Sequence, residues 1–143
     1  MLEMLENFSR LRRALSLAHV QQLKPLGLGA KQAVILRALA KDGPSSAIDL
    51  ARATVSDPAA INRTVGGLIK KGLLRQERDA EDGRRCRLSL TPDLGRPMAA
   101  KVLALTRQLA AQMAQPLAGP EQARFSQDLQ RLTEHLNAQL SRR

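Results

Sequence analysis

The spacing of apolar residues departs from the helical pattern in one stretch of the chain, residues 73–91, and this stretch constrains the fold most. From Arg84 to Thr91, arginine and serine alternate with Cys86, Leu88 and Leu90. Strict alternation is typical of a half-buried strand. Residues 73–78 can form a partner strand, because the Asp-Gly pair at 82–83 is a strong turn signal. The sequence therefore predicts a single β-hairpin, with Cys86 on its inward side.

Helical spacing accounts for the chain on both sides of this hairpin. It predicts helices over residues 2–23, 30–41, 47–53, 58 to about 71, 92 to about 115, and 121–140. Ser45 or Ser46 can cap the third helix, and Asp57 followed by Pro58 can begin the fourth. Pro97 predicts a kink or a delayed regular start in the fifth helix.

The order of these elements describes a winged helix-turn-helix. The third and fourth helices form the turn motif, and the hairpin forms the wing. The expected fold class is mainly α with a small β-hairpin wing, plus N- and C-terminal dimerisation helices (α+β). We expect one chain over 1–143, with a DNA-binding part over 30–91 and dimerisation helices over 1–23 and 93–143.

The charge of the chain favours a polyanionic partner. The net charge is +10, and residues 50–101 hold half of it, with 11 basic and 6 acidic residues. Double-stranded DNA is the first candidate, although a solvated basic surface would give the same count. Aromatic residues make up 1% of the chain, which argues against stacking on single-stranded bases.

Several protein classes are disfavoured. One cysteine cannot form an intrachain disulfide or a cysteine-rich zinc site. The sequence contains no nucleophile–base motif, phosphate-cradling glycine loop or metal cluster, so we expect neither an enzyme nor a cofactor or metal. No apolar run is long enough for a membrane span, and the N-terminus does not resemble a secretory signal. The expected location is the cytoplasm.

The central region resembles the MarR family of transcription regulators. Four pieces carry the resemblance: LARA from Leu50, LIKKGLL from Leu68, the wing segment Asp82-Gly83-Arg84-Arg85, and LSLT followed four residues later by Gly95. The resemblance implies a homodimeric, sequence-specific regulator, acting as a repressor and released by a small anionic or aromatic effector. The alternative is a winged-helix module for protein interactions that has only non-specific DNA affinity.

The fourth helix is the expected recognition helix. Its outward positions include Ala59, Asn62, Arg63 and Lys70. Asn62 could read a base edge in the major groove, and Arg63 either a base or a phosphate. The N-terminus of this helix, formed by Pro58, Ala59 and Ala60, can receive a phosphate through its free backbone amides. Gly66 and Gly67 also face outward and depart from the family pattern. Either a bare face lets the helix sit deeper in the groove, or contacts have been lost by drift.

The wing supplies the second set of DNA contacts. The resemblance implies that a wing arginine enters the minor groove, and Arg84 near the tip is our choice. Arg85 or Arg87 would then bind phosphates, and Asp82 would hold the arginine through a bidentate ion pair. A merely solvated hairpin is the alternative, and the acidic neighbours Asp79 and Glu81 favour it.

The terminal helices carry apolar stripes that a small winged core cannot cover, and pairing with a second copy would bury them. The residues expected at this dimer interface are Met4, Phe8, Leu11, Phe125, Leu129, Leu132 and Leu136. A twofold dimer would place two recognition helices in successive major grooves and select a near-palindromic site.

Two further sites have a functional and a packing interpretation. By the family resemblance, Arg12, Arg13 and His19 could line an effector cleft between the dimerisation helices and the winged part. Solvent-facing arginines and a packed histidine are the alternative. Cys86 is expected to be a small buried apolar residue, and a redox sensor is its alternative.

Overall fold

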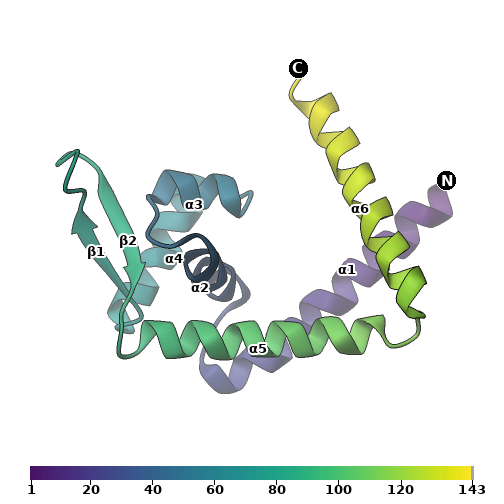
Figure 1. Ribbon diagram of the computed structural model, residues 1–143, viewed down its shortest axis with the longest axis horizontal. Helices are drawn as coiled ribbons and strands as arrows, with labels where there is room; N and C mark the ends of the chain where they lie inside the picture. The colour runs from purple at the N-terminus through teal and green to yellow at the C-terminus, as the bar shows by residue number, and fades with distance from the viewer. Residues whose placement is uncertain (143) are drawn as a thin grey trace. The chain divides into compact units, whose positions relative to one another are not determined.

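The computed structural model describes residues 1–142 and is mainly helical with one hairpin, as predicted (Figure 1). The elements are α1 (Leu2–Leu23), the 3-10 helix η1 (Lys24–Leu26), α2 (Ala30–Asp42), α3 (Ala47–Ala53), α4 (Pro58–Lys70), β1 (Leu74–Arg78), β2 (Cys86–Leu90), α5 (Gly95–Ala114) and α6 (Gly119–Leu140). The chain forms two compact units, Met1–Arg107 and a second that begins at Gln108, within α5.

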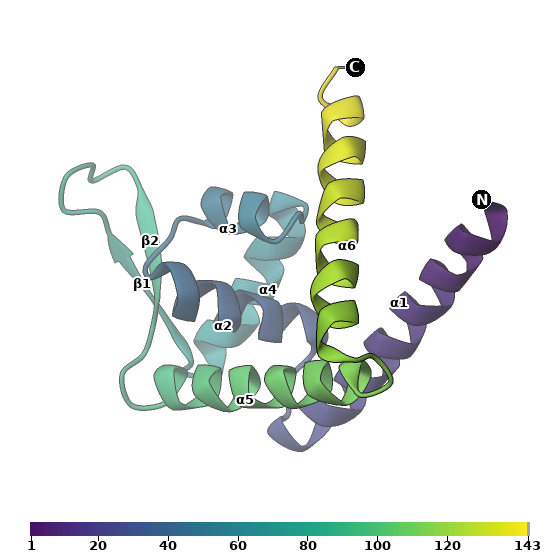
Figure 2. The same ribbon diagram turned by 45° about the vertical axis from the view of Figure 1, so that its right-hand side comes forward.

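The core of the first unit joins the winged helix-turn-helix to the end of α1. Six large side chains are fully buried, and they come from α1, α2, α3, α4 and α5: Leu23, Ile35, Leu36, Leu50, Leu68 and Val102. In this unit α2 lies between α3 and the first part of α5 (Figure 2). Leu23 is the only buried residue of α1. Elsewhere in α1, residues such as Leu15, Ala18 and His19 are only half-buried.

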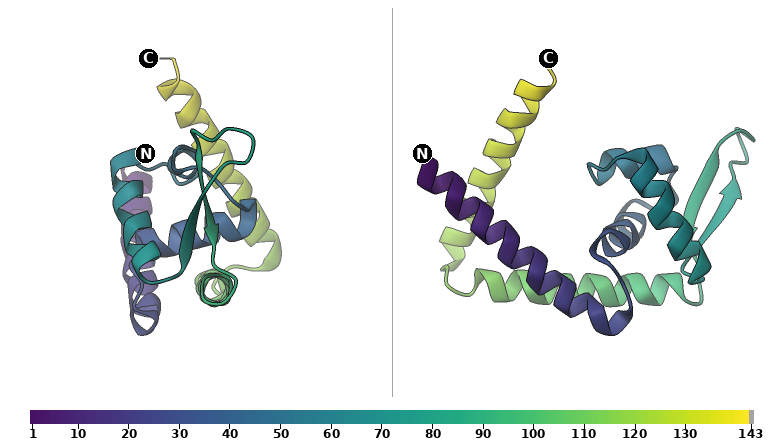
Figure 3. Two further views of the ribbon diagram at one scale, coloured as in Figure 1. Left: turned by 90° about the vertical axis from the view of Figure 1, so that its left-hand side faces the viewer. Right: turned by 180° about the vertical axis from the view of Figure 1, so that it is seen from behind.

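The hairpin is fastened to the helices at its base. Its strands are antiparallel, with Leu74 opposite Leu90 and Arg78 opposite Cys86. Ser45 and Leu88 exchange two backbone hydrogen bonds of 3.1 and 2.8 Å, which tie β2 to the loop before α3. Leu88 is buried there, whereas the far end of the hairpin projects away from the helices (Figure 3).

The turns follow the expected chemistry with one exception. The hydroxyl of Ser46 accepts a 3.1 Å hydrogen bond from the backbone N–H of Asp49 and so caps α3. Gly72 ends α4 with φ of +72°. Asp57 occupies the N-cap position of α4, but its carboxylate accepts no capping hydrogen bond. Helix α4 thus begins with free backbone N–H groups.

Residues 91–95 form a junction between the recognition helix, the wing and α5. The hydroxyl of Thr91 donates to the carbonyl oxygen of Gly72 (2.6 Å) and accepts from the backbone N–H of Gly95 (2.8 Å). The N–H of Thr91 donates to the carbonyl oxygen of Leu73 (3.0 Å). These bonds hold residues 91–94 in a turn, so α5 begins at Gly95 and not at residue 92.

One expectation about burial and one about orientation are wrong. Cys86 is exposed, because it lies at the end of β2 beyond the part of the hairpin that packs on the helices. Gly67 does not face outward: a Cβ there would lie 3.3 Å from the side-chain nitrogen of Gln32 on α2. Gly66 has open space at the same position, so only this glycine leaves a bare surface.

Candidate nucleic-acid interface

Helix α4 turns one face to the core and the other to solvent. Its buried residues are Ile61, Val65 and Leu68. The expected contact residues Pro58, Ala59, Asn62, Arg63 and Lys70 are exposed, and Ala60 is half-buried. The helix therefore presents its N-terminal turn, an amide and two cations on a surface with few bulky side chains.

The hairpin lies beside α4 (Figure 3, right). Between them is a shallow hollow of about 160 Å³, lined by Asn62, Gly66, Gln76 and Cys86, among others. Asn62 thus lies on the side of α4 that faces the hairpin. Cys86 and Leu88 both line this hollow, so alternation placed Cys86 on the correct face although the residue is exposed.

The wing tip is ordered by acidic residues that partly neutralise two of its arginines. The carboxylate of Asp82 accepts a hydrogen bond from the backbone N–H of Arg84 (3.1 Å) and lies 3.6 Å from Nε of Arg85. Asp79 lies 3.8 Å from Nε of Arg87. Asp82 therefore holds the backbone at Arg84 and pairs with the side chain of Arg85 through one close contact.

The positive charge of Arg84 at this tip is not compensated by an acidic side chain. Across residues 1–142 it takes part in no ion pair, and it is exposed. Arg78, at the end of β1, is likewise exposed and without an ion pair among these residues. Arg78 is not among the residues predicted from the sequence, although its position beside the turn signal could have marked it.

The turn before α4 contains a strained residue, Val55, that was not predicted from the sequence either. Val55 has φ of +49° and is 94% exposed. A left-handed backbone is unfavourable for a β-branched residue, and this side chain gains almost no burial in return. No local signal marks the position, because glycine or asparagine would be the residue expected there.

The three residues of the expected effector cleft lie along α1. Arg12 and Arg13 are exposed, and His19 is half-buried. Desolvation by burial, together with the positive charge of Arg37 on α2, lowers the pKa of His19 below its ordinary 6.5. Buried nitrogens of His19 and Arg37 have no hydrogen-bond partner among residues 1–142, and neither has the buried side-chain oxygen of Gln22. Arg37 and Gln22, which were not predicted from the sequence, thus join His19 as side chains with a buried polar atom that has no partner.

The apolar stripes of the terminal helices are open. In α1, Met4 and Phe8 are 47% and 52% exposed, and Leu11 is half-buried. In α6, the exposed stripe residues are Phe125, Leu132 and Leu136, and Leu129 is half-buried. No residue of α6 is buried within its own unit. Each helix therefore retains an uncovered apolar face.

The described residues offer neither a metal cluster nor a membrane-spanning helix. Within residues 1–142, no group of three or more His, Cys, Asp or Glu side chains is arranged to hold a metal ion. No helix in the same range is both long and apolar enough to span a bilayer.

Known proteins with similar sequences are transcription regulators. A model described as the MarR family matches residues 26–85. An HTH-type transcriptional repressor of Mycobacterium tuberculosis is 31% identical over 110 residues, which cover 77% of this chain and 78% of that protein.

Solved structures share the fold over most of the chain. BpsR of Bordetella bronchiseptica, whose DNA binding is regulated by 6-hydroxynicotinic acid, has a TM-score of 0.80 and 25% identity, covering 90% of this chain and 91% of that one. A probable transcriptional regulator of Pseudomonas aeruginosa has a TM-score of 0.73 and 31% identity, covering 87% and 95%. A mutant of Escherichia coli MarR in complex with operator DNA has a TM-score of 0.80 at 19% identity, covering 89% and 91%.

Proposed function

The chain belongs to the MarR family of DNA-binding transcription regulators, and we propose that it acts as a homodimeric repressor that occupies a near-palindromic DNA site. The observation that carries the proposal is the pairing of an exposed recognition helix with a wing whose tip arginine is not neutralised. A winged helix-turn-helix places this helix in the major groove, and an uncompensated arginine suits the narrow minor groove beside it.

The proposed DNA contacts differ in kind. Asn62 and Arg63 read base edges. The free N–H groups of Ala59 and Ala60, just after Pro58, bind a phosphate together with Lys70. Arg84 enters the minor groove. Arg85 and Arg87 are partly neutralised by Asp82 and Asp79, so their contribution is to phosphate binding.

The uncovered stripes of α1 and α6 support the homodimer. Full burial of a large apolar side chain stabilises an assembly by about 1.5–3 kcal/mol. Met4, Phe8, Phe125, Leu132 and Leu136 are each more than a third exposed in the single chain. A second copy is the simplest partner. A twofold axis brings the same stripes of both copies into one interface, so both sets are buried together.

We also propose that the protein works in the cytoplasm and that a small anionic aromatic effector releases it from DNA. The effector is suggested by BpsR, which responds to 6-hydroxynicotinic acid. Its proposed cleft is the region of Arg12, Arg13 and His19, where buried polar atoms lack partners.

Selection of genomic fragments tests the function. The purified protein is mixed with fragments of the source genome at physiological salt, and the bound fraction is sequenced. We expect enrichment of a near-palindrome with half-sites about 10 base pairs apart. Uniform recovery of all fragments would overturn this proposal and favour an interaction module with non-specific DNA affinity.

A further inference from the structure

The hollow of about 160 Å³ between α4 and the hairpin has a fixed floor and one bare edge. Val65 and Leu88 form the floor, and both are buried. Gly66 lies at the edge on α4, where an added Cβ would meet no atom within 4 Å. Its φ is not positive, so neither the backbone nor the packing of residues 1–142 requires glycine there. Because glycine inside a helix is less favourable than alanine, the bare edge indicates a close approach by a molecule outside the chain.

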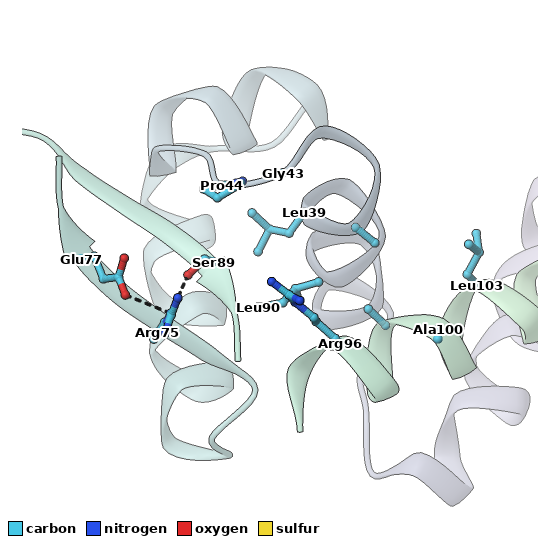
Figure 4. A pocket seen from close by; sticks show the side chains of 12 residues that line it. Leu39, Gly43, Pro44, Arg75, Glu77, Ser89, Leu90, Arg96, Ala100 and Leu103 are labelled. Carbon is cyan, nitrogen blue, oxygen red and sulfur yellow. Dashed lines mark hydrogen bonds and ion pairs between the residues drawn. The ribbon is translucent and has the colours of Figure 1, made fainter. Parts of the chain in front are cut away.

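The hairpin turns an uncharged face to this hollow. Gln76 and Leu88 lie opposite each other across the two strands, and both line it. The neighbours of Gln76 in the chain, Arg75 and Glu77, line a different hollow on the side of α2 and α5 (Figure 4). There they form an ion pair of 3.0 Å. The carboxylate nearest to Gln76 in sequence is therefore turned away, and none of the described residues that line the hollow beside α4 is charged.

Cations flank the hollow on both sides. On α4, Arg63 and Lys70 are exposed and form no ion pair across residues 1–142. On the hairpin, Arg85 and Arg87 are exposed on either side of Cys86, and their acidic partners lie 3.6 and 3.8 Å away. An uncharged surface between positive rims suits an extended polyanion better than a cation or a neutral peptide.

The geometry of a duplex identifies which part of DNA would lie here. The major and minor grooves are separated by one sugar-phosphate strand. If α4 enters the major groove and the hairpin enters the adjacent minor groove, that strand must pass between them. Building on the DNA-binding mode proposed above, we propose that one sugar-phosphate strand lies in this hollow directly against Gly66.

The absent side chain at Gly66 then sets how deeply α4 enters the major groove. The exposed side-chain amide of Gln76 donates a hydrogen bond to a phosphate oxygen of the same strand. Depth matters because Asn62, about one turn earlier on α4, has a short side chain that must lie close to the base edges to bond them. Gly66 is therefore a positioning residue for base recognition.

The thiol of Cys86 reports directly on the proposed strand position. Cys86 is exposed, lines the hollow and is the only cysteine of the chain. Its alkylation by N-ethylmaleimide is timed in the full-length protein at low salt, with and without a duplex of random sequence. With the duplex at about ten times its Kd, alkylation should slow about tenfold, because only the free protein then reacts. An unchanged rate in protein that is bound to DNA overturns the proposal.

Substitution of Gly66 tests the close approach. Gly66→Leu should leave the fold intact, because the space at the Cβ position is open, and should weaken DNA binding at least about tenfold. Gly66→Ala adds less bulk, so its affinity should lie between those of the wild type and the leucine variant. Ala104→Leu is the control, since it places leucine at an exposed position of α5 outside the hollow. Fluorescence anisotropy of labelled DNA measures the affinities, and urea unfolding shows that each variant is folded.

The outcomes separate this proposal from the proposed function. If Gly66→Leu and Ala104→Leu bind DNA alike while Arg84→Ala binds more weakly, the wing holds DNA but no strand passes over Gly66, and the proposal is overturned. If Gly66→Leu weakens binding to random-sequence duplex while the wild type prefers no genomic fragment, the strand contact is supported and the sequence-specific repressor function fails.

Discussion

Replacing Gly95 by alanine places a methyl group at the tightest point of the junction between the wing and α5. A Cβ at Gly95 would overlap the carbonyl oxygen of Leu73 and lie 3.0 Å from the hydroxyl oxygen of Thr91. The Leu73 carbonyl cannot turn away freely, because it accepts the N–H of Thr91 at 3.0 Å. The start of α5 would have to move instead.

The cost of this movement follows from the bonds that it breaks. Forcing an extra methyl group into a packed site costs about 1–3 kcal/mol, and a rigid backbone neighbour favours the upper part of that range. The shift also separates the Gly95 N–H from the Thr91 hydroxyl, which costs about 1 kcal/mol. Alanine recovers at most about 1 kcal/mol of helix propensity. The net prediction is a loss of about 2–3 kcal/mol in the free energy of unfolding.

Gly66→Ala is the matched control, because the same chemical change should have the opposite sign. Gly66 lies inside α4, and a Cβ there meets no atom within 4 Å. Alanine should stabilise the helix by about 1 kcal/mol. The two variants should therefore differ in stability by about 3–4 kcal/mol.

Urea unfolding followed by helical circular dichroism measures this difference. The chain has no Trp or Tyr, so intrinsic fluorescence is of little use. With a slope of about 2 kcal/mol per molar urea, Gly95→Ala should lower the midpoint by about 1–1.5 M. All samples need the same protein concentration, because dimerisation would shift the midpoint. If Gly95→Ala unfolds at the wild-type midpoint or above it, the contact between Gly95 and Leu73 does not constrain the fold.

Three further predictions concern single side chains. Arg84→Ala should weaken DNA binding about tenfold and reduce by about one unit the slope of log affinity against log salt concentration. Arg107→Ala, which removes an exposed charge from α5, should change neither, and fluorescence anisotropy of labelled DNA at several salt concentrations measures both variants. Val55→Asn should raise the free energy of unfolding by about 1 kcal/mol, because asparagine tolerates the left-handed backbone and Val55 is 94% exposed; an unchanged urea midpoint would contradict this. The lowered pKa of His19 favours its neutral form in the folded state, so its contribution to stability is full above pH 6.5 and is lost as the pH falls through the folded-state pKa. His19→Gln should therefore flatten the dependence of the urea midpoint on pH below 6.5, and equal slopes in wild type and variant would exclude this assignment.

The sequence predicted the helices best where capping and periodicity agree. Residues 2–23 and 47–53 were expected to be helical, and α1 and α3 have these bounds. The hairpin is shorter than expected, because Arg84 and Arg85 belong to the turn that Asp82 and Asp79 organise. Side-chain contacts between acids and backbone N–H groups inside a turn leave no periodic signal, so the strand appeared to begin too early.

The orientation of individual residues was harder to predict, because periodicity says nothing about what covers each face. Alternation placed Cys86 and Leu88 on one side of β2, and both line the hollow beside α4, yet only Leu88 is buried. Spacing along α4 treated Gly66 and Gly67 as equivalent, yet Gln32 of α2 lies against only one of them. The terminal stripes are apolar, as predicted, and their residues stay largely exposed in the single chain.

The junction at Thr91 shows why three separate sequence signals belong to one structural feature. Gly72 ends the recognition helix, Leu73 precedes the wing, and Gly95 begins α5, and the backbone groups of all three bond to Thr91. The direction of the wing relative to α4 is thus fixed by the same residues that start the helix leaving the winged unit. Because none of them lies on the exposed face of α4 or at the wing tip, substitutions here should reduce the fraction of folded protein, whereas Arg84→Ala should reduce the affinity of protein that remains folded.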